Sequence, residues 1–158
     1  MKKILCVGTM VLAMVATCVP AFAADENIGV SPFKPGTNTG IETRTTSKPG
    51  YFETYDIASL GKYKFSGQAA NESLYTNYSF IGCTAYDIQV KNLKGSNAES
   101  LDVVVYKSPA IGTDKKLKSV TVKGQITKNI SISSLKTGDR VFIEFKAPSH
   151  FSGWIDEG

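Results

Sequence analysis

The chain has 158 residues, of which 42% are hydrophobic and 20% are charged, with 18 basic and 14 acidic side chains. This length is enough for one domain with a hydrophobic core. A formal net charge of +4 is nearly balanced and gives no strong case for a nucleic-acid-binding protein.

The N-terminus has the three parts of a secretory signal peptide. A basic start at Met1–Lys3 is followed by an apolar run, Ile4–Val19, and by the small-x-small pattern Ala21-Phe22-Ala23. The apolar run is shorter than the roughly 20 residues that a membrane-spanning helix needs. We predict that residues 1–23 are removed and that the mature protein is secreted, with attachment to the cell surface left open. Lipoprotein-type cleavage before Cys18 is the competing interpretation, but a threonine fits the preceding position poorly.

Removal of residues 1–23 would leave 135 of the 158 residues, a net charge of +2 and one cysteine, Cys83. A single cysteine cannot form an internal disulfide, so stability must come from the hydrophobic core. Metal sites built on thiolates need several cysteines or a cysteine–histidine cluster, and His150 is the only histidine. We therefore expect no cofactor and no metal of that kind, and leave open a structural calcium ion.

Residues 24–50 are rich in proline, glycine, threonine and serine, and Lys-Pro-Gly occurs at 34–36 and again at 48–50. Proline followed by glycine at the two central positions is typical of a type II turn. This composition predicts a flexible N-terminal arm. The alternative is an arm that adds an edge strand through Ile41.

From residue 51 to residue 158, hydrophobic side chains alternate with polar ones. Six runs show this period of two: 63–65, 86–90, 101–105, 120–122, 130–132 and 141–145. Successive side chains of a strand point to opposite faces, so the alternation predicts strands with one buried and one wet face. Glycine, asparagine and aspartate mark turns between the runs. We predict an all-β domain, a single antiparallel β-sandwich of jelly-roll type.

A lone cysteine and a lone histidine raise the question of a Cys83–His150 hydrolase acting on peptide or cell-wall substrates. A cysteine nucleophile needs a base and a setting that lowers its pKa, such as a helix N-terminus. Cys83 lies instead in the strand-like run "NYSFIGCTAYD", among small and apolar neighbours. We favour a packing role for Cys83 and no enzymatic activity. An intermolecular disulfide, which needs an exposed sulfur, is the third alternative.

Trp154 is the strongest candidate for ligand binding. If Phe151 and Ile155 enter the core, the alternation places Trp154 on the outer face of its strand. Carbohydrate-binding modules use such exposed aromatic rings to stack against sugars. The alternation also places Tyr106 on the outer face of its strand, where its ring could extend the sugar-binding surface of Trp154. The alternative is that Trp154 covers the end of the sandwich or packs against the arm, because tryptophan is usually well buried.

Seven lysines lie between residues 107 and 136 against one acidic residue, Asp114; they are Lys107, Lys115, Lys116, Lys118, Lys123, Lys128 and Lys136. This local excess could hold an anionic cell-wall polymer, and such binding would weaken with salt. The simpler interpretation is that lysines on edge strands prevent aggregation. A structural or assembly subunit that docks through an edge strand is a further alternative.

A resemblance adds to this interpretation. The segments "YTNYSFIGCTAYDIQVKNL" and "SLKTGDRVFIEF" resemble small secreted bacterial β-sandwich proteins of uncharacterised role, and the second is also similar to accessory sandwich domains found after secreted peptidases. The resemblance covers roughly residues 75–155 and implies secretion and a sandwich fold. It implies no catalytic residue. Altogether we expect a secreted, non-catalytic β-sandwich that acts by surface contact with a cell-envelope or extracellular polysaccharide.

Overall fold

The computed structural model describes residues 45–96 and 99–158. The predicted signal peptide and residues 24–44 of the predicted arm lie outside these residues. The elements in chain order are β1 (Thr54–Asp56), α1 (Ile57–Leu60), β2 (Tyr63–Ala69), β3 (Leu74–Tyr75), β4 (Ser79–Ile81), β5 (Tyr86–Asn92), β6 (Ser100–Ser108), β7 (Lys115–Lys123), β8 (Thr127–Ile132), β9 (Arg140–Phe145) and β10 (Ser149–Glu157). In the described residues, no helix is both long enough and apolar enough to cross a membrane.

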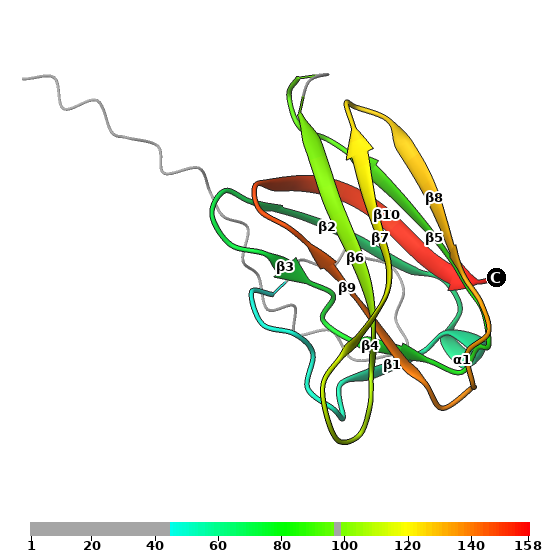
Figure 1. Ribbon diagram of the computed structural model, residues 1–158. Coiled ribbons are helices and arrows are strands. Elements are labelled where there is room, and N and C mark those ends of the chain that lie inside the picture. Colours follow the sequence, from blue (N-terminus) through cyan, green and yellow to red (C-terminus); the bar gives the residue numbers. More distant parts are fainter. Residues whose placement is uncertain (1–44, 97–98) are drawn as a thin grey trace, which may run out of the picture.

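The strands form two sheets that pack face to face (Figure 1). One sheet has the order β1-β4-β9-β6-β7, with β3 also paired to β9, and the other has the order β2-β10-β5-β8. The strand pairs are antiparallel except for β1 and β4. The orders β2-β10-β5-β8 and β4-β9-β6-β7 are those of a jelly roll. The predicted all-β sandwich is confirmed.

The hydrophobic residues of the alternating runs form the inner face of each sheet. In β2 the buried positions are residues 63, 65, 67 and 69, and in β5 they are residues 86, 88, 90 and 92. Each of the six predicted runs lies in a strand, from β2 through β5, β6, β7 and β8 to β9. The period of two therefore identified these strands correctly.

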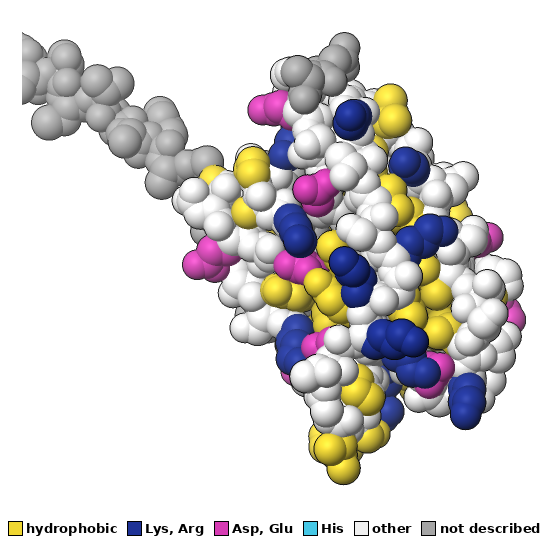
Figure 2. Space-filling model, in the orientation of Figure 1, with side chains coloured by type: hydrophobic (Ala, Val, Ile, Leu, Met, Phe, Trp, Pro, Cys, Tyr) yellow, Lys and Arg dark blue, Asp and Glu magenta, His cyan; other side chains and the backbone are white. Residues whose placement is uncertain are grey.

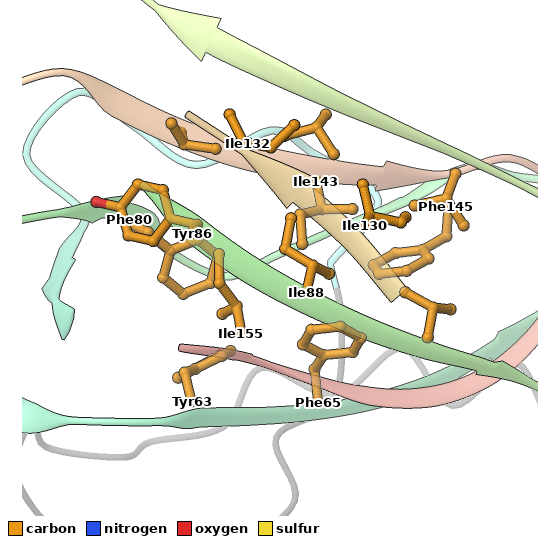
Figure 3. Close-up of a cluster of buried hydrophobic side chains, with 14 of the residues drawn as sticks. Tyr63, Phe65, Phe80, Tyr86, Ile88, Ile130, Ile132, Ile143, Phe145 and Ile155 are labelled. Atoms are coloured by element: carbon orange, nitrogen blue, oxygen red, sulfur yellow. The ribbon is translucent and has the colours of Figure 1, made fainter. Parts of the chain in front are cut away.

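Aromatic rings from both sheets fill the space between the layers (Figure 3). The rings of Phe145 on β9 and Phe151 on β10 stack with their centroids 3.6 Å apart. Phe65 on β2 lies 5.4 Å from Phe145. All three side chains are buried, so this cluster joins the four-stranded sheet to the six-stranded one.

The segment "NYSFIGCTAYD" is not one continuous strand. Gly82, with a φ of +97°, ends β4, and β5 begins only at Tyr86. A positive φ is costly for residues with a side chain, and a Cβ at Gly82 would also collide with the Asp56 carboxylate, which caps α1. The break changes the parity and turns Cys83 into the core, where it is 3% exposed. The prediction of one continuous strand was wrong, whereas the predicted packing role of Cys83 is confirmed.

The type II turn predicted at Lys48-Pro49-Gly50 does not form. That turn needs a positive φ at its glycine, and Gly50 is not among the glycines with positive φ. The reversal instead spans Gly50 to Glu53, where the Glu53 N–H donates to the Gly50 carbonyl at 3.0 Å. The Glu53 carboxylate also accepts a hydrogen bond from the Gly50 N–H at 2.7 Å, and this contact shifts the turn along the chain.

Candidate ligand-binding face on strand β10

Trp154 lies on the outer face of the four-stranded sheet. Strand β10 is central in this sheet, and Trp154 is opposite Lys64 of β2 and Gln89 of β5. Its neighbours of opposite parity, Phe151 and Ile155, are fully buried in the core. The outward parity predicted for Trp154 is therefore confirmed, although its side chain is half-buried between its neighbours on the sheet.

Side chains of three adjacent strands fix the position of the indole. Its Nε1–H donates to Oε1 of Gln89 at 3.1 Å, and Nε2 of Gln89 donates to Oδ1 of Asn129 on β8 at 3.1 Å. The ammonium group of Lys62 lies 4.2 Å from the ring centroid and forms an ion pair of 3.2 Å with Asp156. A fixed ring loses little conformational entropy when it binds a ligand.

A shallow hollow of about 220 Å³ opens beside the indole. Lys64, Gln89, Lys91, Thr127, Ser152 and Trp154 line it. Lys62, whose ammonium group lies against the ring, is not among the residues that line the hollow. The ring therefore forms one wall of a site whose other polar groups are amide, hydroxyl and ammonium.

A second hollow of about 310 Å³ adjoins the first along β10. Ser152 lines both hollows, and His150 and Gln68 line the second. We call the outer surface over His150, Ser152 and Trp154 the β10 face. Since a strand rises about 3.4 Å per residue, this face extends about 14 Å along β10.

Tyr106 does not belong to this face. It lies on β6 of the six-stranded sheet, so the two sheets separate it from Trp154 and no common platform exists. Its ring stacks on Phe142 at 5.2 Å, and its hydroxyl donates to Glu144 at 2.9 Å. The alternation within each strand gave the correct parity for Tyr106 and Trp154, but parity alone cannot say to which sheet a strand belongs.

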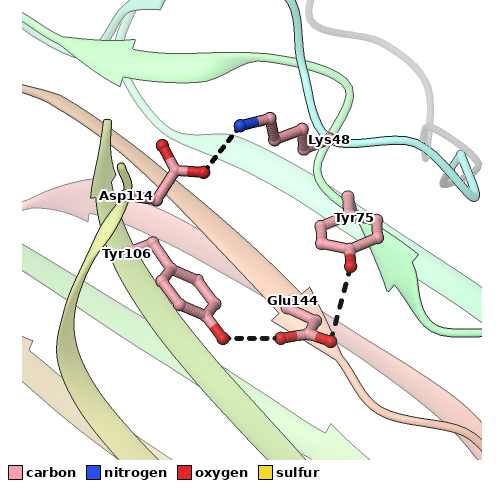
Figure 4. Close-up of polar contacts among 5 residues, drawn as sticks. All are labelled: Lys48, Tyr75, Tyr106, Asp114 and Glu144. Carbon is pink, nitrogen blue, oxygen red and sulfur yellow. Dashed lines mark hydrogen bonds and ion pairs between the residues drawn. The ribbon is translucent and has the colours of Figure 1, made fainter. Parts of the chain in front are cut away.

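Glu144 is buried, although its parity on β9 predicted a wet position. The Tyr106 hydroxyl donates to Oε2 and the Tyr75 hydroxyl donates to Oε1, at 2.9 and 3.5 Å (Figure 4). The residue is 9% exposed. The outer face of the six-stranded sheet is therefore not uniformly wet, because two tyrosines cover the carboxylate and satisfy it. The ion pair between Lys48 and Asp114, at 2.8 Å, lies nearby.

These contacts predict a loss of stability at alkaline pH. Burial, and then the hydrogen bond and charge of Glu144, raise the pKa of Tyr106 to about 12. Burial also raises the pKa of Tyr75 and of Tyr86. An unfolded tyrosine has a pKa of about 10, so the folded protein binds these protons more tightly. The stabilisation is complete below about pH 10 and is lost as the pH rises toward 12.

The measurement is the free energy of unfolding from urea titrations at a series of alkaline pH values. Tyr106→Phe removes one of the titrating hydroxyls, and we expect its stability to fall less steeply with pH than that of the wild type. If the free energy of unfolding fell equally steeply with pH in the two proteins, Tyr106 would not be a source of the pH dependence.

Cys83 and His150 are not brought together. The Cys83 N–H donates to the Tyr86 hydroxyl, and Tyr86 pairs with Glu157 at the end of β10, whereas His150 lies at the beginning of that strand. Burial, and then the charges of nearby carboxylates, raise the pKa of the Cys83 thiol. A nucleophilic thiolate needs the opposite shift, so this geometry does not support the hydrolase alternative. Burial of the sulfur also disfavours an intermolecular disulfide.

Five of the seven lysines between residues 107 and 136 lie on β7 and β8, the edge strands of the two sheets. The ammonium group of Lys118 on β7 donates to the Ser131 carbonyl of β8 at 3.0 Å. Charged edges disfavour the addition of another strand. This arrangement supports the edge-protection interpretation and not docking through these two strands. In residues 45–96 and 99–158, no three His, Cys, Asp or Glu side chains form a group that could hold a metal.

The polar residues that line the first hollow were not predicted as site residues. Gln89, Lys91 and Ser152 have outward parity in their strands, as Trp154 has, but the sequence does not say that β10 lies between β2 and β5. The spacing of a jelly roll could have supplied this order, because its last strand pairs with its first.

Comparison with known proteins found no matching protein-family model and no matching curated protein. Among solved structures, the chain is similar to one described as "Family 16 Carbohydrate Binding Module-2", with 14% sequence identity and a TM-score of 0.33. The match covers 62% of this chain and 74% of that one. A TM-score this low supports no argument about function.

Proposed function

We propose that the protein is a secreted, non-catalytic β-sandwich that binds polysaccharide on the β10 face. The observation that carries the proposal is a single tryptophan, held in place on the outer face of the sheet, beside an open hollow lined with amide and hydroxyl groups. Aromatic rings combine a flat apolar surface with a polar edge, which suits the C–H faces and hydroxyl groups of a sugar. The few polar groups around the hollow would orient the ring of the sugar.

The shape of the face favours a chain rather than a single sugar. The two hollows share Ser152 and follow one another along β10. Both are open, so a polymer could enter from either end without threading. The face thus supports binding of several consecutive sugar units, with one unit stacked on Trp154.

The charge around the first hollow favours an acidic polysaccharide. Lys64 and Lys91 line this hollow, and none of its lining residues is acidic. Carboxylate or sulfate groups on the polymer would be attracted to the two ammonium groups, and salt would screen the attraction. An anionic wall polymer is therefore a better candidate than a neutral glucan.

A binding titration with Trp154→Ala tests the proposal. We expect acidic glycans to shift the intrinsic tryptophan fluorescence of the wild type. Removing the ring should lower the affinity about tenfold or more, since buried aromatic anchors commonly account for 2 kcal/mol of binding. Affinity of the variant is measured by calorimetry or by sedimentation with insoluble glycan, because the variant has no tryptophan.

Tyr106→Phe is the matched control, since it alters an aromatic residue on the other sheet and should leave glycan affinity unchanged. Lys64→Gln and Lys91→Gln should weaken binding of acidic polymers and make it less sensitive to salt. The proposal fails if no acidic or neutral glycan moves the fluorescence of the wild type.

A further inference from the structure

Exposed hydrophobic side chains gather at one end of the sandwich. Among the described residues, four large ones are exposed: Tyr51 at 38%, Phe52 at 89%, Ile111 at 93% and Ile126 at 54%. Tyr51 and Phe52 form the turn before β1, and Ile111 lies at the tip of the hairpin between β6 and β7. Three of the four therefore belong to two loops.

Specific contacts join the Tyr51 turn to the base of the hairpin. Arg140 pairs in register with Ser108, the last residue of β6. The guanidinium group of Arg140 donates from Nε to the Tyr51 carbonyl at 3.1 Å and lies 3.8 Å from the centroid of the Tyr51 ring. The Tyr51 and Phe52 rings meet edge to face at 5.1 Å. Phe52 is thus exposed beside an anchored residue.

A second contact links the segment before this turn to the hairpin. Lys48 forms an ion pair of 2.8 Å with Asp114, which follows the hairpin tip. The tip of the hairpin lies at the bottom of Figure 1, and hydrophobic atoms gather at the tip of the projecting lobe at the bottom of Figure 2. We call the surface over Tyr51, Phe52 and Ile111 the apolar end.

Basic side chains outnumber acidic ones around the apolar end. The acidic residues of these loops and strand ends are Glu53, Asp56, Asp114 and Asp139. The basic ones are Lys48, Lys107, Lys115, Lys116, Lys136 and Arg140. Asp114 and Asp139 are already paired with Lys48 and Lys107. The excess positive charge therefore includes the exposed Lys115 and Lys116, directly after the hairpin tip.

We propose that the apolar end inserts Phe52 and Ile111 into the surface of an anionic lipid bilayer. The two side chains stand on separate, convex loops. A protein partner would need a complementary surface of about 800 Å² on each side, whereas the interfacial region of a bilayer can bury separate protrusions independently. The neighbouring lysines would then contact anionic headgroups. This surface includes no residue of the β10 face, so the inference is independent of polysaccharide binding.

Sedimentation of the mature protein with lipid vesicles tests the inference. We expect binding to vesicles of equimolar phosphatidylcholine and phosphatidylglycerol, and much weaker binding to phosphatidylcholine alone. The double variant Phe52→Ser, Ile111→Ser should bind the anionic vesicles about tenfold less tightly or worse, since it loses both apolar anchors. Lys115→Gln with Lys116→Gln should reduce the difference between the two kinds of vesicle.

Ile126→Ser is the matched control, because Ile126 is exposed in the turn between β7 and β8 and lies outside the apolar end. It should bind vesicles as the wild type does. Thermal unfolding of each variant checks that it is folded. The inference is overturned if the wild type does not bind anionic vesicles, or if the Phe52 and Ile111 variant binds them equally well.

Discussion

Replacing Gly153 with alanine is expected to destabilise the protein by more than about 3 kcal/mol, which is a large part of the stability of an ordinary domain. Gly153 lies in β10 between Phe65 of β2 and Val90 of β5. A Cβ at this position would collide with the Gln89 carbonyl oxygen and would lie 2.7 Å from Cε2 of Phe65. The Phe65 ring fills the space that the missing side chain leaves. Neither the central strand nor this buried ring can move without disturbing the core.

Urea unfolding of Gly153→Ala measures this effect. The matched control is Gly138→Ala, since no atom lies within 4 Å of a Cβ added at Gly138. We expect the control to change stability by no more than about 0.5 kcal/mol. Similar stability of the two variants would show that β10 can yield at this point, which would contradict the tight packing of Gly153.

Replacing Phe151 with alanine should cost about 3–5 kcal/mol, the usual range when a buried phenylalanine is truncated. Phe151 is fully buried and stacks on Phe145 of the opposite sheet. Truncation would remove apolar contact and would leave a cavity at the junction between the two layers. Phe52→Ala is the matched control, because the same chemical change at a side chain that is 89% exposed should cost little.

A double-mutant cycle isolates the contact between the two rings. Phe145→Ala alone should also be strongly destabilising. The double variant should be less destabilised than the sum of the two single variants, by about 0.5–1.5 kcal/mol. Strict additivity would mean that the two rings contribute independently and that their stacking adds no stability of its own.

The sequence predicted long strands well and short ones poorly. Strands such as β2 and β5 carry seven residues of strict alternation, and this pattern is sufficient to identify a strand and its buried face. Strands β1, β3 and β4 have only two or three residues, and none of the six predicted runs lies in them. They form because β9 and its neighbours offer them backbone partners, and such partners are distant in the sequence.

Trp154 and Tyr106 show what parity can and cannot predict. The alternation placed both side chains correctly with respect to their own strands. Whether two outward residues meet depends on strand order, and that order is set by pairing across the whole domain. For the same reason, the burial of Glu144 could not be predicted, because the two tyrosines that cover it come from β3 and β6.

The place of β10 between β2 and β5 has a consequence for biosynthesis. Both partners leave the ribosome well before residues 149–157, and until then each exposes an unsatisfied backbone edge toward the vacant centre of its sheet. The four-stranded sheet therefore cannot be completed until β10 has been synthesised. Its completion depends on contacts between distant parts of the chain, which form slowly.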